Sequence, residues 1–130
     1  FTPVKVDDSD DHEMHHEQVT LSGGLARRIA TWPEECPIIA VGTTTVRALE
    51  GFATGRRQVR SGTGSTNLFI TPGYTFRVVD SLITNFHLPR STLLMLVSAL
   101  RSREVVLHAY REAVREGYRF FSYGDAMYLP

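Results

Sequence analysis

A group of side chains able to exchange protons and hold ligands lies between an apolar stretch and a following helix. Thr84, Asn85 and His87 come directly after the apolar segment 78–83. An imidazole can exchange a proton near neutral pH, and residues at i and i+2 of a strand face the same side. Open α/β sheets bind ligands where strands end beside helix N-termini. The segment therefore predicts a site with His87 as an acid–base group, although a lone histidine is more often a satisfied core residue.

The helix expected next brings two hydroxyl groups to the same place. Pro89 suits a first helical turn, and an apolar stripe at helical spacing follows it, formed by Leu93, Leu94, Val97 and Leu100. Ser91 and Thr92 lie at the start of this helix. They can cap its N-terminus or contact a ligand, and both interpretations stay open.

A second strand-to-helix junction follows the apolar run Ile38–Val41. In the sequence Gly42-Thr43-Thr44-Thr45, glycine lets the backbone approach a ligand, Thr43 can cap a helix, and first-turn amides favour negative charge. Arg47 adds a partner for a carboxylate or phosphate. The lysine of a Walker loop and the glycines of a dinucleotide fingerprint are missing. Taken alone, this stretch is more often an ordinary helix start.

The run His12-Glu13-Met14-His15-His16 fits the zinc-protease pattern, in which two histidines one helical turn apart bind the metal and a glutamate activates water. Such motifs lie on a substantial helix. Here the run stands between acidic residues and a β-prone segment with two glycines soon after. The pattern therefore indicates coincidence more than a metal site.

The apolar periodicity predicts an α/β fold, with a mixed, mostly parallel sheet flanked by helices in one domain over residues 1–130. The expected strands are Val19–Leu21, Ile38–Val41, Leu68–Ile70, Phe76–Thr84 and Arg119–Tyr123. Helices are expected over Leu25–Ala30, after Gly42, from Pro89, and around Val106–Val114. The basic and glycine-rich stretch Arg56–Ser65 has no periodicity and is expected to be a mobile loop. The polar ends after Val41, Thr84 and Tyr123 should meet at one sheet edge.

Three long motifs, in order, resemble the S-adenosylmethionine:tRNA ribosyltransferase-isomerase family of queuosine biosynthesis. They are Gly42–Glu50, Asp80–Ala99 and Tyr118–Met127. The resemblance implies transfer and isomerisation of the ribosyl part of S-adenosylmethionine onto 7-aminomethyl-7-deazaguanine in a tRNA anticodon, giving epoxyqueuosine, adenine and methionine. It implies no metal or redox cofactor, because the sulfonium acidifies the neighbouring ribose carbon and leaves as a neutral thioether. S-adenosylmethionine is then a consumed co-substrate.

The resemblance also selects site residues. The acid–base candidates are His15, Glu17, His87 and Asp125; the binding candidates are Thr43, Thr44, Thr45, Arg47, Asn85, Ser91 and Thr92. Which residue is the general base stays open. Gly124-Asp125 would otherwise be only a turn, and Tyr123 could stack on a base, although packing is the commoner role for such a residue. Family members have His12, Met14, His15 and Glu17 at matching positions, which leaves His16 outside their pattern.

The basic stretch can be interpreted in two ways. Arg56, Arg57 and Arg60 could bind an RNA backbone, and a solvated charged loop is the commoner explanation. The tRNA substrate that the resemblance implies gives RNA contact a modest edge. The sequence Ser65-Thr66-Asn67 departs from the family, which more often has an aspartate before its Phe-Ile-x-Pro-Gly run. That departure leaves the role of the basic stretch in doubt.

Composition sets outer limits on the function. The 130 residues carry 14 basic and 14 acidic side chains, so no global field favours nucleic acid, and any RNA contact must be local. The single Cys36 fits a reducing compartment, and no apolar run has membrane-spanning length. We expect a soluble cytoplasmic protein without membrane or metal partners.

The chain starts at Phe1 without an initiator methionine. Members of the resembled family are much longer, with a barrel-like domain inserted into a larger α/β domain, and the match is to the carboxyl-terminal part of the latter. We therefore expect a fragment that is inactive alone. Two other classes remain: a noncatalytic nucleotide- or RNA-binding module, and a zinc hydrolase using His12 and His16.

Overall fold

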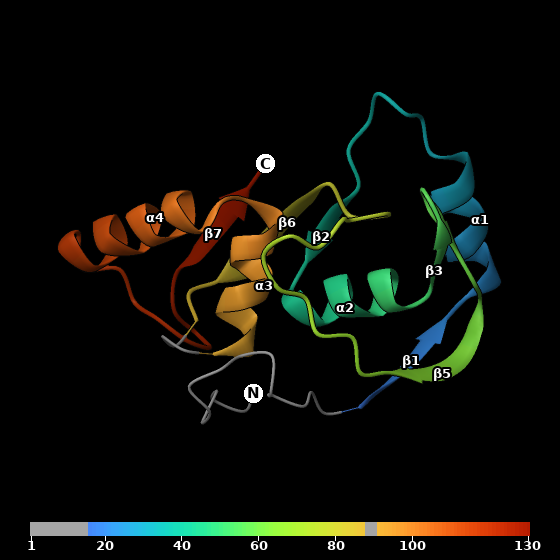
Figure 1. The fold of residues 1–130 in the computed structure, drawn as a ribbon, viewed down its shortest axis with the longest axis horizontal. Helices are drawn as coiled ribbons and strands as arrows, with labels where there is room; N and C mark the ends of the chain where they lie inside the picture. Colours follow the sequence, from blue (N-terminus) through green and yellow to red (C-terminus); the bar gives the residue numbers. More distant parts are fainter. Residues whose placement is uncertain (1–15, 88–90) are drawn as a thin grey trace.

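A computed structural model describes residues 16–87 and 91–130 (Figure 1). Its elements in chain order are β1 (Glu17–Leu21), α1 (Gly23–Thr31), β2 (Ile39–Val41), α2 (Thr43–Gly51), β3 (Ala53–Gly55), β4 (Gln58–Val59), β5 (Gly62–Thr66), β6 (Ser81–Asn85), α3 (Thr92–Leu100), α4 (Arg103–Arg115) and β7 (Ala126–Leu129). The mixed α/β class and the four expected helices are confirmed.

The central sheet has the strand order β2-β6-β7. β2 runs parallel to β6, with Ile39 opposite Ser81, and β7 runs antiparallel on the other side of β6. In the described residues, parallel pairing is confined to β2 and β6. One face of this sheet is buried through Ala40, Leu82, Thr84 and Leu129. Its apolar residues share a core with Val46 and Leu49 of α2 and with Leu96 and Val97 of α3.

The opposite face of the central sheet is apolar and exposed. Strand residues alternate between faces, so Ile39, Val41, Ile83 and Tyr128 point away from the core, and Val41 is 66% exposed. Parallel strands are usually covered on both faces. Within the described residues, this face therefore has the character of a surface that another layer normally covers.

The stretch Arg56–Ser65 is not a mobile loop, so that expectation was wrong. β3 and β4 form a hairpin, and β5 pairs antiparallel with β1, with Leu21 opposite Gly62. Arg60 lies over the ring of Phe52, with its guanidinium carbon 3.7 Å from the ring centroid. The sequence Gly-Thr-Gly-Ser-Thr of β5 has no apolar alternation and therefore gives no local signal of a strand. Its strand structure depends on hydrogen bonds to a distant partner.

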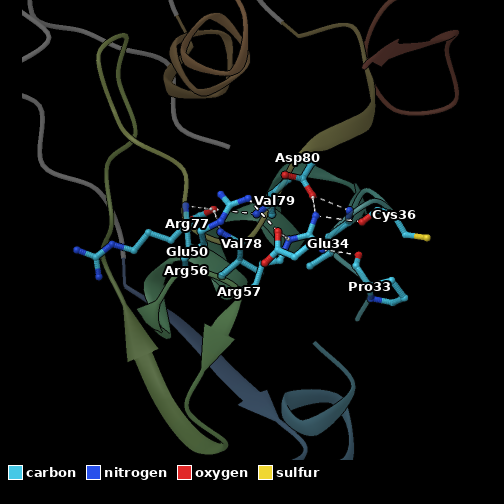
Figure 2. A network of polar contacts seen from close by, with 11 residues as sticks. Pro33, Glu34, Cys36, Glu50, Arg56, Arg57, Arg77, Val78, Val79 and Asp80 are labelled. Atoms are coloured by element: carbon cyan, nitrogen blue, oxygen red, sulfur yellow. Dashed lines mark hydrogen bonds and ion pairs between the residues drawn. The ribbon is translucent and has the colours of Figure 1, made fainter. Parts of the chain in front are cut away.

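The expected long strand Phe76–Thr84 is shorter, because a buried carboxylate occupies its first backbone donors (Figure 2). Glu50 of α2 accepts hydrogen bonds from the backbone N–H groups of Arg77, Val78 and Val79 at 3.0–3.1 Å. Tyr74 adds its hydroxyl at 3.2 Å, and burial, followed by the charge of Glu50, raises the pKa of Tyr74 to about 12. Strand pairing therefore starts only at Ser81.

The next residue, Asp80, carries a second carboxylate that holds two other parts of the chain. Asp80 accepts hydrogen bonds from the backbone of Ile38 and from Arg57, both at 2.8 Å (Figure 2). The buried Arg57 also donates to the carbonyl groups of Pro33 and Cys36. This arginine therefore joins the turn before β2, the hairpin and the start of β6. Leu68–Ile70, expected as a strand, is irregular, and the carbonyl of Leu68 accepts from Arg47.

The expected strand Arg119–Tyr123 is also wrong, since a tight loop stands there and β7 begins at Ala126. Phe120 turns inward and packs on Phe86, with ring centroids 5.0 Å apart, while Tyr110 and Tyr118 approach Phe86 edge-on. Aromatic packing attaches this loop to the end of β6 and to α4. The backbone N–H of Phe121 adds a hydrogen bond to the carbonyl of Phe86 at 3.0 Å.

Replacing Glu50 with glutamine keeps the side-chain size but turns one acceptor oxygen into a donor facing backbone N–H groups. We expect the free energy of unfolding to fall by about 3 kcal/mol or more, because each hydrogen bond to a charged acceptor contributes roughly 1.5–3 kcal/mol. Urea denaturation followed by circular dichroism measures the change. Glu112→Gln removes an exposed ion pair with Arg115 and should cost less than about 1 kcal/mol. Equal losses in the two variants would contradict this account.

Candidate functional site

A cleft of about 410 Å³ opens where the carboxyl ends of β2 and β6 meet the N-termini of α2 and α3. Its lining consists of Val41, Gly42, Thr43, Thr44, Thr45, Asn85, Phe86, His87, Ser91, Leu93, Phe121 and Ser122. The junctions expected to gather at one sheet edge do meet here. This confirms the predicted geometry of the edge, even though residues 119–123 reach it as a loop.

The α2 side of the cleft presents backbone amides. Gly42 stands before the helix with φ +93°, a left-handed conformation that favours glycine, and its N–H donates to Ile83 at 2.8 Å. No side chain caps the first turn of α2, since the hydroxyl of Thr45 donates to the carbonyl of Val41 instead. Uncapped first-turn amides form a favourable place for a carboxylate or phosphate.

His87 forms the β6 side of the cleft and is 8% exposed. Its Nε2 lies 3.1 Å from the hydroxyl of Thr84, and its backbone N–H donates to the hydroxyl of Tyr110 at 2.9 Å. Burial lowers the pKa of His87 from 6.5 to about 4. The near-neutral pKa expected from the sequence was therefore wrong. The imidazole is neutral at physiological pH and can accept a hydrogen bond, but it is a weak base.

The cleft lining, in the part of the chain that the structure describes, contains no aspartate, glutamate, lysine or arginine. His87 is its only side chain that titrates between pH 2 and 8. A ligand at this site would therefore meet hydroxyl groups, amide dipoles and a neutral imidazole. Arrangements of this kind recognise polar and charged groups through oriented dipoles.

Of the two candidates at the start of α3, one lines the cleft and the other does not. Ser91 lines the cleft, and its hydroxyl accepts from the backbone N–H of Leu94 at 3.2 Å. This contact leaves the hydroxyl proton able to donate elsewhere. Thr92 is buried and does not line the cleft. Asn85 lines the cleft and donates its amide to the carbonyl of Phe121 at 3.2 Å.

Arg47 and Glu17 lie outside the cleft lining and pair with each other. Arg47 is buried on α2, and it also donates to the carbonyl of Leu68 at 3.2 Å. The pair joins β1, α2 and the segment after β5. Asp125 is also absent from the cleft lining: its carboxylate accepts from the backbone N–H of Arg119 at 2.7 Å and closes the loop around residues 119–125.

Sequence reasoning did not select Phe121 and Ser122, which form one wall of the cleft. The signal available was their position between an aromatic run and Gly124-Asp125, where a turn was one of the interpretations. Glu50 was also missed. It stands four residues after Val46, on the buried side of α2, and a charged residue at such a position indicates a buried partner.

The run from His12 to His15 lies outside the described residues, so the structure does not place it. Among the described residues, no group of three His, Cys, Asp or Glu side chains could hold a metal ion. The three arginines named as RNA contacts all have protein partners: Arg56 pairs with Glu34, Arg57 with Asp80, and Arg60 with the ring of Phe52.

The family model of the queuosine biosynthesis protein matches residues 1–129. The chain belongs to this family. Relatives called S-adenosylmethionine:tRNA ribosyltransferase-isomerase include one from Geotalea uraniireducens, 54% identical over 130 residues, and one from Moorella thermoacetica, 55% identical. The family resemblance drawn from the three motifs is thereby confirmed.

A crystal structure of the S-adenosylmethionine tRNA ribosyltransferase from Thermotoga maritima superposes on the chain with a TM-score of 0.77 and 48% identity. It covers 88% of this chain, which spans 40% of that protein. The matches to the Geotalea and Moorella relatives cover 99% of this chain, which spans 38% of the length of each relative. In the described residues, no helix is long and apolar enough to cross a membrane.

The lowered pKa of His87 predicts how stability depends on pH. Between about pH 4 and 6.5 the unfolded state binds more protons at this residue than the folded state does, so its contribution is complete above pH 6.5 and is lost as the pH falls towards 4. At pH 5 the loss should be about 2 kcal/mol. Chemical denaturation of the wild type and of His87→Gln at pH 7 and pH 5 measures it. Equal losses in the two proteins on acidification would contradict the prediction.

Proposed function

We propose that the chain forms part of the active site of an S-adenosylmethionine:tRNA ribosyltransferase-isomerase. The enzyme would transfer and isomerise the ribosyl moiety of S-adenosylmethionine onto 7-aminomethyl-7-deazaguanine in tRNA, releasing adenine and methionine. The observation that carries the proposal is the cleft, which joins Gly42–Thr45, Asn85, His87 and Ser91. Family membership and the names of the relatives support the same reaction.

The described residues suggest a division of labour. The uncapped first turn of α2, with Thr43 and Thr44, would hold the carboxylate of the methionine part through oriented amides and hydroxyl groups. Asn85 and Ser91 would position the ribose. The sulfonium makes the neighbouring ribose carbon acidic and departs as a neutral thioether, so the reaction needs no metal or redox cofactor.

His87 would act as a neutral imidazole in this reaction. Its lowered pKa favours the form that accepts a hydrogen bond or a proton. The other acid–base candidates stay predictions: His15 lies outside the described residues, and Glu17 and Asp125 do not line the cleft. The partners would be S-adenosylmethionine and a tRNA with the modified wobble base, in the cytoplasm.

The decisive assay is adenine release from S-adenosylmethionine by a full-length protein that contains this chain, with tRNA carrying the modified base. We expect release that depends on that tRNA. A protein that binds both substrates and releases no adenine would be a noncatalytic binding module, and this outcome would overturn the proposal. Elemental analysis of the same preparation tests the zinc alternative.

The chain alone should fold but release no adenine. Its helices and strands share one core, formed around residues such as Val46, Leu82, Leu96 and Val97, which should give a cooperative thermal transition. The chain spans only 38–40% of the length of its relatives, so we expect it to lack other parts of the site that are needed to orient two substrates. Differential scanning calorimetry and adenine release measure both parts. Adenine release by the chain alone near the rate of the full-length protein would contradict the expectation.

Replacing His87 with alanine in the full-length protein should lower kcat by about 100-fold or more, the usual contribution of a group that exchanges a proton. Stability at pH 7 should fall far less than activity does. The matched control is His108→Ala, which removes an exposed histidine of α4 outside the cleft. Nearly full turnover by H87A would show that His87 has no catalytic role.

A further inference from the structure

The loop between Arg119 and Asp125 holds two aromatic residues in a backbone conformation that bulky side chains rarely adopt. Phe121 has φ +68° and Tyr123 has φ +65°; among described residues other than glycine, only Arg57 also has a positive φ. Such conformations are unfavourable for L residues and persist only where the surroundings enforce them. They concentrate at ligand-binding and catalytic sites.

Hydrogen bonds enforce this conformation from several sides. Asp125 binds Arg119 twice, through its carboxylate at 2.7 Å and its backbone N–H at 2.8 Å. Phe121 donates its N–H to the carbonyl of Phe86 at 3.0 Å and accepts from Asn85. At Gly124 a Cβ atom would lie 2.7 Å from two carbonyl oxygens, so only glycine fits there. The loop is thus fixed before any ligand arrives.

The result of this bracing is an aromatic side chain presented to solvent beside the cleft. Tyr123 is 100% exposed, and the residue before it, Ser122, lines the cleft together with Phe121. Tyr118 and Phe120 of the same segment instead pack on Phe86. The ring of Tyr123 therefore contributes little to the core, while its backbone remains in an unfavourable conformation.

We propose that Tyr123 is a stacking surface for a nucleobase held beside the cleft. The proposal rests on the proposed function, which supplies two nucleobase sources: the adenine of S-adenosylmethionine and a base of the tRNA. A flat ring stacks on either, and a ring on a fixed backbone loses little entropy on binding.

The test compares three replacements of Tyr123 in the full-length protein. Tyr123→Phe keeps the flat ring, Tyr123→Leu keeps apolar bulk without it, and Tyr123→Gly removes the side chain while relieving the left-handed backbone. Isothermal titration calorimetry measures the Kd of S-adenosylmethionine and, separately, of an anticodon stem-loop RNA. Loss of a stacked base typically weakens binding about tenfold or more.

We expect Y123F to bind like the wild type, and both Y123L and Y123G to weaken one of the two ligands at least about tenfold. The ligand affected identifies the source of the base. The melting temperature of Y123G should equal or exceed that of the wild type, because glycine relieves the strain. Wild-type affinity for both ligands in Y123L and Y123G would overturn the proposal.

A protein segment packed on Tyr123 would give a different pattern. Y123L would then retain most of the stability and both affinities, whereas Y123G would melt at a lower temperature than the wild type. That pattern also overturns the proposal. Both measurements are independent of catalysis, so a wild type that binds its ligands without releasing adenine refutes the proposed reaction and still decides the role of Tyr123.

Discussion

The buried carboxylate of Glu50 determines where the central strand begins. By accepting the N–H groups of Arg77, Val78 and Val79, it prevents these residues from extending β6 (Figure 2). Asp80 is then the first residue free to reach Ile38 and Arg57, and this contact places Ser81 opposite Ile39. Because the register of β2 and β6 follows from these contacts, Gly42 ends level with Thr84, and Asn85 comes one residue further on at the cleft. The cleft thus depends on an interaction at the other end of the strands.

This dependence explains what could be predicted from the sequence. Helices α2 and α3 and the two junctions at Gly42 and Thr84 were found because apolar periodicity and polar strand ends are local signals. The location of β5 was missed because its glycine, serine and threonine residues pair with β1 more than 40 residues earlier. The start of β6 was misplaced because Val78 and Val79 are strong strand formers, and their N–H groups bind a side chain from another element.

The candidate site shows the same division between local and distant signals. The positions of Thr43, Asn85 and Ser91 followed from the strand and helix boundaries. The pKa of His87 did not, since it depends on burial created by elements that include α4, whose Tyr110 holds the backbone of His87. Arg47 had the residue type of an anion binder, yet its partners are Glu17 and a backbone carbonyl group. Residue type and position in the sequence therefore predicted the correct edge of the sheet, but they did not predict the individual contacts of these residues.

The exposed face of the central sheet affects how the chain behaves when it is handled alone. Ile39, Val41, Ile83 and Tyr128 form an apolar surface across all three strands, and both β2 and β7 are edge strands of that sheet in the described residues. An apolar surface beside open strand edges favours contact between copies, and this association strengthens with concentration. Sedimentation or scattering measured on the chain alone would then report self-association through this surface. An oligomeric state obtained in this way describes the uncovered sheet of the chain alone.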